Sequence, residues 1–334
     1  MEDLISVIVC TYNQEKTIAR TLDSILMQQC HVAFEIVIGE DCSTDGTLSV
    51  CQAYREKRPD IIRLMANKKN KGLIDNYFDC ILAARGKYIA DCAGDDFWGD
   101  PQKLEKEVAI LESEPEVTLV HTDWNTYDES TRILTASREK PFTDRITDGK
   151  LMLESIITQT SVPVIHLCTS LYRTDIIRKA LQEDEHLFRN KEFGCEDMQV
   201  AFTMALQGKI AFIPDRTLNY SQNRETVSCS KDDRRQFRFV RRTTALSHYL
   251  AQKHGLSSAT VQDYFDYRIF ALAMHAFRAH DHNLYQETQE CEKEWHTRRS
   301  LLTTCLFGIM RHEWLWSIAL LGRRMFVTLK RVYR

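Results

Sequence analysis

Acidic side chains gather in three short segments of this 334-residue sequence, where together they could act on a phosphorylated ligand. The segments are residues 40–46, residues 91–100 and the pair Glu196 and Asp197. Carboxylates repel a diphosphate unless a cation lies between the two, and a hard divalent ion held by one or two Asp removes that conflict. The chemistry to expect is a divalent cation, Mn²⁺ or Mg²⁺, between these carboxylates and phosphate oxygens.

Some of these acids have a simpler explanation. Asp45 precedes a glycine and Asp100 precedes a proline, so we expect both to close turns or cap helices. The adjacent Asp95 and Asp96 are harder to explain in this way, because neighbouring like charges at a strand end destabilise each other without a partner. The sequence contains no glycine-rich phosphate motif of the dinucleotide or P-loop type, which disfavours a nicotinamide or P-loop site.

Repeated βα units position the acidic segments. Continuous apolar runs predict strands, and apolar residues at helical spacing predict the helices between them. The strands are expected at 4–10, 34–38, 61–65 and 88–90, and the helices at 18–26, 47–57 and 73–84. This pattern predicts an α/β fold: a doubly wound, mostly parallel sheet with helices on both faces. Ligands bind such sheets at the carboxyl ends of the strands, so the loops at 11–13, 40–46 and 91–100 should converge.

The second half of the sequence is less regular. The pair Asp100 and Pro101 is expected to open a helix, and Gly208 to end another that begins at Asp197. Further strands are predicted at 117–121, 165–172 and 210–213, with a polar, irregular segment at 123–149. From about residue 230 only helices are predicted. We therefore expect an α/β domain at 1–230 and a helical region at 231–334.

The composition is that of an ordinary globular protein. Hydrophobic residues make up 43 % of the chain, and 44 Lys and Arg stand against 47 Asp and Glu, a formal net charge of −3. This balance argues against a disordered chain and against a nucleic-acid binder, which would need a broad basic surface. The eleven cysteines include no Cys-x-x-Cys pair, and no leader segment is evident, so a cytoplasmic location is expected.

Four segments carry a family resemblance. In chain order they read SVIVCTYNQEKTIARTLDSI (6–25), EIVIGEDCSTDGT (35–47), ARGKYIADCAGDDFWGDPQKL (84–104) and GCEDMQVAFTMALQGKIAFIPD (194–215). Together they resemble the successive motifs of inverting glycosyltransferases of family two, of the bacterial surface-polysaccharide type, which have a GT-A fold. The resemblance covers roughly residues 4–230. It implies a nucleoside-diphosphate sugar as donor, most commonly a UDP-sugar, and a divalent cation.

The resemblance also implies roles on the donor side. Asp41 matches the acid that recognises base or ribose, and Asp95 and Asp96 match the later acids of the Asp-x-Asp-Asp metal and donor motif. The first position of that motif is Ala93 here, which removes one expected carboxylate. The loop that contacts the nucleotide is matched by Thr11, Tyr12 and Asn13.

On the acceptor side, the resemblance implies that Asp197 is the catalytic base, with Glu196 beside it. By itself, an acid at a helix start is also explained by the helix dipole. Trp98 is expected either to line the sugar pocket or to be buried against the following helix. Arg224 lies in a segment resembling the closing loop, where Ser221 replaces the usual Arg. A surface position is favoured for Arg224, and contact with the diphosphate is the alternative. His166 is expected in the core or at the crevice, in reach of the acceptor.

The implied reaction moves a sugar to a hydroxyl of a glycan or lipid-linked acceptor in polysaccharide or lipopolysaccharide synthesis. Two alternatives stay open. A sugar nucleotidyltransferase shares a related sheet, but usually has a glycine-rich basic loop after the first strand, which TYNQEKT lacks. A non-catalytic nucleotide-sugar-binding or scaffold protein would explain Ala93. An oligomer is possible, and no nucleic-acid partner is expected.

The C-terminal residues carry a net positive charge, in contrast to the rest of the chain. Residues 298–334 contain eight Lys and Arg and one acid, Glu313, which leaves a net charge of −10 for residues 1–297. Apolar residues from Trp314 to Val332 fall on one helical face and basic residues on the other. This amphipathic pattern predicts peripheral binding to an anionic membrane surface, and packing on the protein itself or on another subunit is the alternative.

Overall fold

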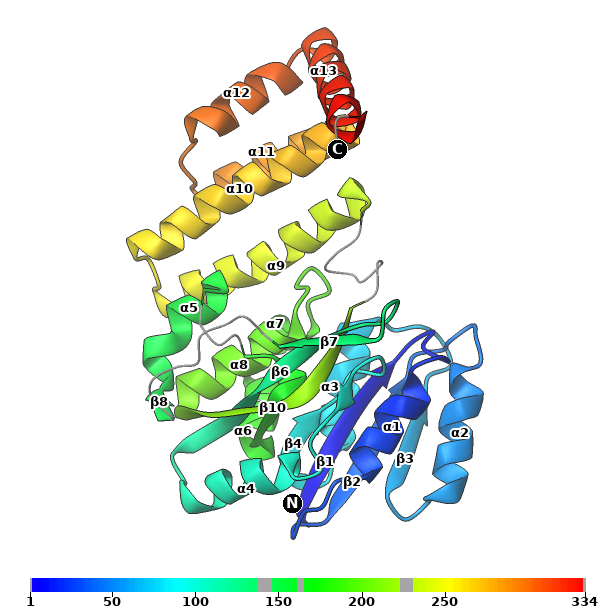
Figure 1. Cartoon of the computed structure of the whole chain (residues 1–334). Helices are drawn as coiled ribbons and strands as arrows, with labels where there is room; N and C mark the ends of the chain where they lie inside the picture. The colour runs from blue at the N-terminus through cyan, green and yellow to red at the C-terminus, as the bar shows by residue number, and fades with distance from the viewer. Residues whose placement is uncertain (1, 137–145, 161–164, 223–230, 333–334) are drawn as a thin grey trace. The chain divides into compact units, whose positions relative to one another are not determined.

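The computed structural model describes residues 2–136, 146–160, 165–222 and 231–332, with side chains placed between residues 4 and 322 of these ranges (Figure 1). The chain divides into two compact units. One comprises Met1–Lys191 with Cys195–Asn223, and the other comprises Glu192–Gly194 with Arg224–Arg334. We call them the α/β unit and the helical unit.

The first half of the α/β unit alternates strands and helices, because apolar runs of strand length alternate with amphipathic segments. The strands are β1 (Glu2–Thr11), β2 (Phe34–Glu40), β3 (Ile62–Ala66) and β4 (Gly86–Asp91), all parallel in the order β3-β2-β1-β4. Between them lie α1 (Ile18–Leu26), α2 (Thr47–Lys57) and α3 (Leu73–Ala83). Helices α1 and α2 cover one face of the sheet and α3 the other (Figure 1).

The second half adds antiparallel strands, so the complete sheet is mixed. Strand β9 (Ser170–Arg173) runs antiparallel to both β4 and β6 (Val117–Asp128), and β10 (Lys209–Gln222) runs parallel to β6. Three short strands pair at the margins: β5 (Phe97–Trp98), β7 (Ile133–Ala136) and β8 (Ile146–Asp148). The helices are α4 (Lys103–Ser113), α5 (Leu153–Thr158), α6 (Thr174–Glu183), α7 (Glu185–Arg189) and α8 (Glu196–Gln207), with short 3₁₀ helices at Gly149–Met152 and Leu167–Thr169.

Several predicted boundaries in this half are wrong. Strand β6 continues to Asp128 and β7 and β8 follow, so much of the segment expected to be irregular is paired. Strand β10 continues past Pro214, because the register shifts between Ile213 and Arg216 and leaves the proline in a bulge that needs no ladder N–H. Helix α4 begins at Lys103, with Asp100 and Pro101 in the preceding turn. The strand expected from residue 165 begins only at Ser170.

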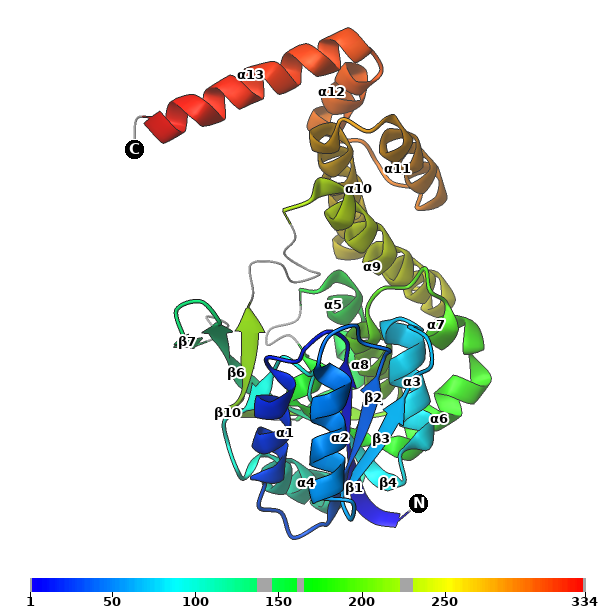
Figure 2. The same ribbon diagram turned by 90° about the vertical axis from the view of Figure 1, so that its right-hand side faces the viewer.

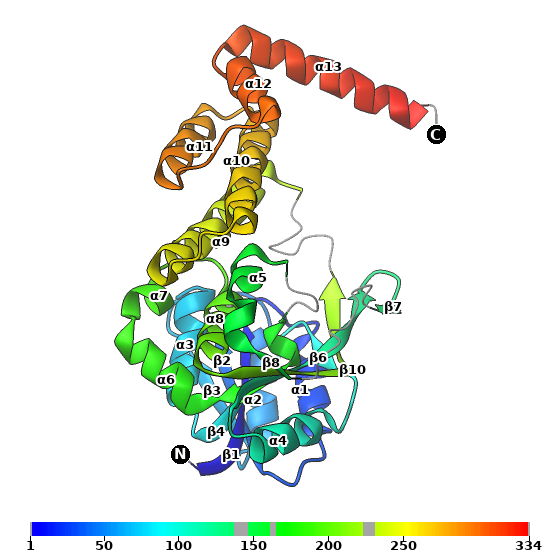
Figure 3. The ribbon, with the colours of Figure 1, turned by 90° about the vertical axis from the view of Figure 1, so that its left-hand side faces the viewer.

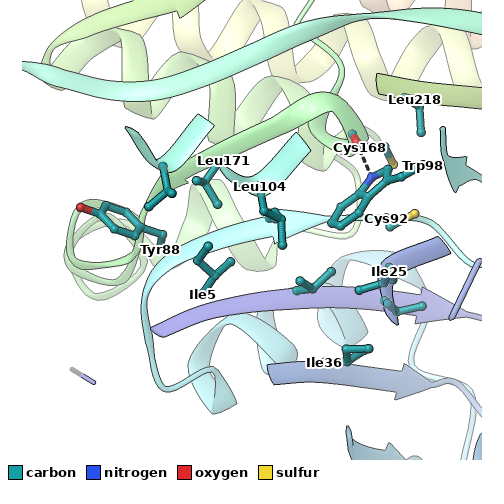
Figure 4. Packing of buried hydrophobic residues seen from close by; sticks show 14 of the residues in the cluster. Ile5, Ile25, Ile36, Tyr88, Cys92, Trp98, Leu104, Cys168, Leu171 and Leu218 are labelled. Carbon is teal, nitrogen blue, oxygen red and sulfur yellow. Dashed lines mark hydrogen bonds between the residues drawn. The ribbon is translucent and has the colours of Figure 1, made fainter. Parts of the chain in front are cut away.

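The core of the α/β unit forms between the sheet and its helices (Figure 4). Trp98 lies inside it with 1 % of its surface exposed, and its Nε1 donates a hydrogen bond to the carbonyl of Cys168 at 3.0 Å. Of the two alternatives for this residue, burial is therefore correct, and its ring does not face a sugar pocket.

Within residues 231–332 the helical unit has five successive helices, and α10 packs against α9, α11 and α12 (Figures 2 and 3). They are α9 (Asp233–His254), α10 (Ala259–Ala279), α11 (His282–Glu294), α12 (Leu301–Met310) and α13 (Glu313–Val332). The N-cap side chains of Ser258, Asp281 and Ser300 accept backbone N–H groups and so define three helix starts. No helix in the described part of the chain is long and apolar enough to cross a membrane.

Candidate active site

The loops after β1, β2 and β4 meet at the carboxyl edge of the parallel strands, as predicted. The amide of Asn13 donates to Ser43 Oγ at 3.0 Å, and Asn13 Oδ1 accepts from the amide of Thr44 at 2.8 Å. The amide of Gly94 donates to the carbonyl of Cys10 at 3.1 Å. A Cβ on Gly94 would lie 2.8 Å from Thr11 Oγ1, so only glycine allows this approach. The sheet thus brings the three loops together.

The predicted nucleotide loop offers one exposed aromatic ring. Tyr12 is 46 % exposed, whereas Thr11 is buried. Asn13 adopts a positive φ of 54° and is held by the loop after β2. The buried Thr11 therefore supports the loop, and Tyr12 and Asn13 are the side chains that it exposes to solvent.

Asp41 is buried and its carboxylate is already well bound. Oδ1 accepts from Asn67 Nδ2 and from the amide of Lys71, and Oδ2 accepts from the amide of Gly72, each at 2.9 Å. These bonds fix the loop between β3 and α3 beside the loop after β2. Asp41 thus has a structural task in addition to the ligand contact that the sequence predicts for it.

The main chain of Asp95 is clamped by Arg20, a residue that sequence reasoning missed. One guanidinium nitrogen of Arg20 donates to the carbonyl of Asp95 at 3.0 Å, and the guanidinium lies 4.3 Å from the Phe97 ring centroid and 5.0 Å from that of Tyr127. Arg20 also pairs with Glu129 at 2.5 Å. Arg20 therefore fixes the acidic loop through its backbone and leaves the Asp95 carboxylate for another partner.

Asp95 and Asp96 have different surroundings. Asp96 is buried, and its Oδ1 accepts the amide of Ser221 at 2.8 Å, while Ser221 Oγ donates to the carbonyl of Asp95 at 2.6 Å. Desolvation raises the pKa of Asp96 well above its ordinary value, and the charge of Asp95 raises it further. Asp95 keeps partial exposure. In this structure Asp96 ties the loop to β10, and Asp95 is the acid better placed for a ligand.

Desolvation also raises the pKa of Asp95, and the charge of Glu129 adds to this rise, whereas Arg20 and His166 lower it. A nearby cation would therefore stabilise the ionised form of Asp95. Among the residues with described side chains, a ready-made cluster of three ligand atoms within 4.8 Å occurs at Cys30, His31 and Glu105. That cluster lies where α1 leads into β2, at the opposite end of the strands. The hard oxygen of Asp95 fits Mg²⁺ or Mn²⁺ in a site completed by phosphate oxygens and water.

Glu196 and Asp197 form the first turn of α8, where the helix dipole favours negative charge. Asp197 Oδ1 accepts the amide of Leu167 at 2.9 Å, which fixes the orientation of the carboxylate. Desolvation and then the charge of Asp197 raise the pKa of Glu196 to about 8. The two carboxyls are thus close enough for the charge of Asp197 to act on Glu196.

Asp91, at the end of β4, is a further buried carboxyl that the predicted site residues do not include. Desolvation raises its pKa to about 8, and the charge of Asp197 also raises it, although the hydroxyls of Tyr77 and Tyr172 favour the charged form. These two hydroxyls are 2.7 Å apart. Its position at a strand end was visible in the sequence, but its burial was not.

Aromatic rings adjoin the acidic loop. The ring of His166, whose charge acts on Asp95, lies 4.9 Å from that of Tyr220 and 6.1 Å from that of Trp124. Within the described residues, His166 Nδ1 is buried without a hydrogen-bond partner. Trp124 and Tyr220 are partly exposed, and therefore take the place beside the acidic loop that the sequence offered to Trp98. Arg224, predicted for the closing loop, lies outside the described residues.

A family model described as "Glycosyl transferase family 2" matches residues 6–181. The chain belongs to glycosyl transferase family 2. Putative glycosyltransferase EpsE of Bacillus subtilis (strain 168) is 40 % identical over 125 residues, 37 % of this chain and 44 % of EpsE. This family-two chain spans about a third of the length of the mycobacterial relatives that it matches.

Two solved structures support the GT-A fold of this family-two member. TarS 1-349 of Staphylococcus aureus in complex with UDP-GlcNAc has a TM-score of 0.54 at 16 % identity, covering 89 % of this chain and 93 % of that one. The mannosyltransferase PcManGT from Pyrobaculum calidifontis, in complex with GDP-Man and Mn²⁺, has a TM-score of 0.53 at 17 % identity, covering 95 % and 86 %. At these identities the likeness extends to the fold alone.

Proposed function

We propose that this protein is an inverting glycosyltransferase that moves a sugar from a nucleoside-diphosphate donor to a hydroxyl of a glycan or lipid-linked acceptor. The observation that carries the proposal is the meeting of the Asp95 loop and the Glu196 and Asp197 turn at the carboxyl edge of a family-two sheet. Neighbours of the same fold bind UDP-GlcNAc and GDP-Man, which supports a nucleotide sugar as donor. We take a UDP-sugar as the first candidate.

The donor is bound by the loops after β1, β2 and β4. Tyr12 offers its exposed ring to the base, with Asn13 next to it on the same loop and Asp41 on the loop after β2. Asp95 would hold Mn²⁺ or Mg²⁺, which when bound neutralises charge on the departing diphosphate. Arg20, Ser221 and Asp96 hold the Asp95 loop in place.

The base is Asp197. The amide of Leu167 occupies Oδ1, so Oδ2 is the oxygen available to an acceptor hydroxyl. As this oxygen takes the proton, a bond forms between the acceptor oxygen and the anomeric carbon, and the bond from that carbon to the diphosphate oxygen breaks. Attack from the face opposite the leaving group inverts the configuration. The raised pKa of Glu196 favours its neutral form beside Asp197.

The acceptor meets the aromatic side of the site. Trp124 and Tyr220 present partly exposed rings, and His166 Nδ1 is a buried polar atom that an acceptor hydroxyl can satisfy. The TarS protein of Staphylococcus aureus, named a poly(ribitol-phosphate) beta-N-acetylglucosaminyltransferase, is 28 % identical over 225 residues, 66 % of this chain and 36 % of TarS. This relative supports a bacterial surface-polymer acceptor.

A nucleotide panel tests the proposal. Thermal unfolding is measured with UDP, GDP, dTDP and CMP, each with and without Mn²⁺. We expect one nucleotide to raise the melting temperature in the presence of Mn²⁺, since a ligand at 100 times its Kd adds about 2.7 kcal/mol to the free energy of unfolding. Failure of every nucleotide would refute the donor site. Slow hydrolysis of the matching nucleotide sugar then separates an enzyme from a non-catalytic binding protein.

A further inference from the structure

Helix α13 presents a stripe of large apolar side chains to solvent. Trp314, Ile318 and Leu321 are 63 %, 60 % and 60 % exposed, and their spacing of four and three residues places them on one face of the helix. Isolated exposed apolar residues need no explanation, but a row of them along one helix marks an interaction surface.

The orientation of this stripe is fixed by a residue on another side of α13. Trp316 is fully buried, its Nε1 donates to the carbonyl of Phe277 at 2.9 Å, and its ring stacks on that of Phe277 with an interplanar angle of 12°. Trp316 therefore anchors α13 to α10. Turning the stripe inward would expose this indole and break its hydrogen bond, so the stripe faces out in the folded helical unit.

The segment that contains the stripe has a net positive charge in the sequence. Residues 298–334 contain eight Lys and Arg and one acid. Among the side chains that the structure describes, Arg298 pairs with Asp266 and Arg299 with Glu292. The single acid, Glu313, contacts His280 at 2.8 Å. A net positive segment that carries an apolar stripe is complementary to a surface that is both apolar and anionic.

We propose that α13 lies in the plane of an anionic lipid bilayer and inserts the stripe of Trp314, Ile318 and Leu321 between the lipid headgroups. The apolar side chains leave water for the acyl boundary, and the basic residues meet the anionic headgroups. A second copy of the chain fits this surface less well, because it would bring the same positive segment against its own. The proposal does not depend on the transferase reaction.

The test uses the full chain and sedimentation with vesicles of phosphatidylcholine and phosphatidylglycerol at 7:3, and of phosphatidylcholine alone. We expect binding to the anionic vesicles that weakens at 0.5 M NaCl, where charges are screened. The double variant Ile318→Ser with Leu321→Ser should bind at least about tenfold more weakly, because two large apolar side chains no longer leave water. Both side chains are exposed, so the variant should keep the wild-type melting temperature.

The matched control is Tyr267→Ser, which removes a side chain that is 64 % exposed on α10 of the same unit and should leave vesicle binding unchanged. Absence of binding to the anionic vesicles would overturn the proposal, and so would equal binding by the double variant. It would also be overturned by analytical ultracentrifugation showing a stable dimer that Ile318→Ser with Leu321→Ser converts to monomer, because the stripe would then be covered by a second copy.

Discussion

Two buried carboxyls at opposite ends of the parallel strands behave in opposite ways. Glu35, near the start of β2, is 2 % exposed, and Asp91, at the end of β4, is 4 % exposed. Burial alone would raise the pKa of Glu35, but the amide and guanidinium of Arg85 and the hydroxyl of Ser6 hold it below its ordinary value. Burial raises the pKa of Asp91 to about 8. The hydrogen-bond and charged partners of Glu35, together with the stronger desolvation of Asp91, set the difference.

The contrast extends to the neighbours of each residue. Ser6 Oγ donates to Glu35 at 2.7 Å and Arg85 donates twice, at 2.8 Å from the amide and at 3.0 Å from Nε. At the other end, desolvation raises the pKa of Asp95, Asp96 and Glu196 as well. The fold places the cationic Arg85 against Glu35, a carboxylate with a structural role. Where it leaves several acids without enough positive charge, a cationic ligand is the natural complement.

The largest effect is expected at Asp197, where a substitution should change turnover without changing stability. Asp197→Asn should lower turnover by about 10²–10⁴-fold, the usual contribution of a positioned base. Asparagine still accepts the amide of Leu167, so melting temperature and nucleotide affinity should stay at wild-type values. Single-turnover transfer and nucleotide titration measure the two properties. Turnover near the wild-type value would remove Asp197 from the role of base.

At the opposite end, Glu35→Gln should lower the free energy of unfolding by about 1–3 kcal/mol at pH 7, because an amide replaces a carboxylate that accepts charge-assisted bonds from Arg85. The pKa of Glu35 is lowered in the folded state, so its stabilisation is fully present above the ordinary pKa of about 4.5 and disappears as pH falls through the folded value. Urea unfolding at pH 7 and pH 3 measures this loss. Glu116→Gln, at an exposed pair with Lys209, is the control and should change stability by less than about 0.5 kcal/mol.

The parallel half of the sheet could be predicted closely because its signals are local. The helix predicted at 47–57 is found at Thr47–Lys57, and the apolar runs become β1, β2 and β4 with small extensions. The errors lie where pairing with a strand distant in sequence determines the secondary structure. Polar residues 123–128 belong to β6 because β10 lies beside them, and Pro214 stays within β10 because a bulge accommodates it. The local sequence shows neither the pairing of β6 with β10 nor the bulge at Pro214.

In the site, too, the residues within local motifs were predicted and those set by distant contacts were not. The sequence motifs located Asp95, Asp96, Glu196 and Asp197, and the structure brings their segments together. Arg20 was missed because its partners are distant: Glu129 lies 109 residues away and Ser221 lies 201 residues away. Ser221 was noted only as a departure from the family pattern, whereas in the fold it supports both aspartates. Supporting residues of this kind follow from tertiary contacts alone.

Asp91→Asn tests the comparison through the direction in which the free energy of unfolding changes with pH. The folded pKa of Asp91, about 8, exceeds the unfolded value near 4, so as pH rises through this window the unfolded chain loses the proton first and the free energy of unfolding falls. Asparagine cannot ionise. The wild type should therefore lose at least about 1 kcal/mol more than the variant between pH 5 and pH 8.

Urea unfolding at these two pH values measures the difference. Glu56→Gln, which removes an exposed carboxyl on α2, should follow the wild type. If Asp91→Asn follows the wild type too, the carboxyl of Asp91 is ionised in the folded protein and its burial is compensated, which would make it resemble Glu35.

The smallest effect concerns Arg20, whose guanidinium contacts the Asp95 loop at the acidic end. Arg20→Lys keeps the charge but loses the planar group held against Phe97 and Tyr127, and a single ammonium cannot reproduce the bonds to Asp95, Glu129 and Ser221 together. We expect nucleotide binding in Mn²⁺ to weaken by about threefold to tenfold, which is about 0.7–1.4 kcal/mol. Calorimetric titration measures it, and Arg58→Lys, at an exposed pair with Asp60, should bind as the wild type does. Unchanged affinity in Arg20→Lys would mean that Ser221 and Asp96 hold the loop without the planar guanidinium.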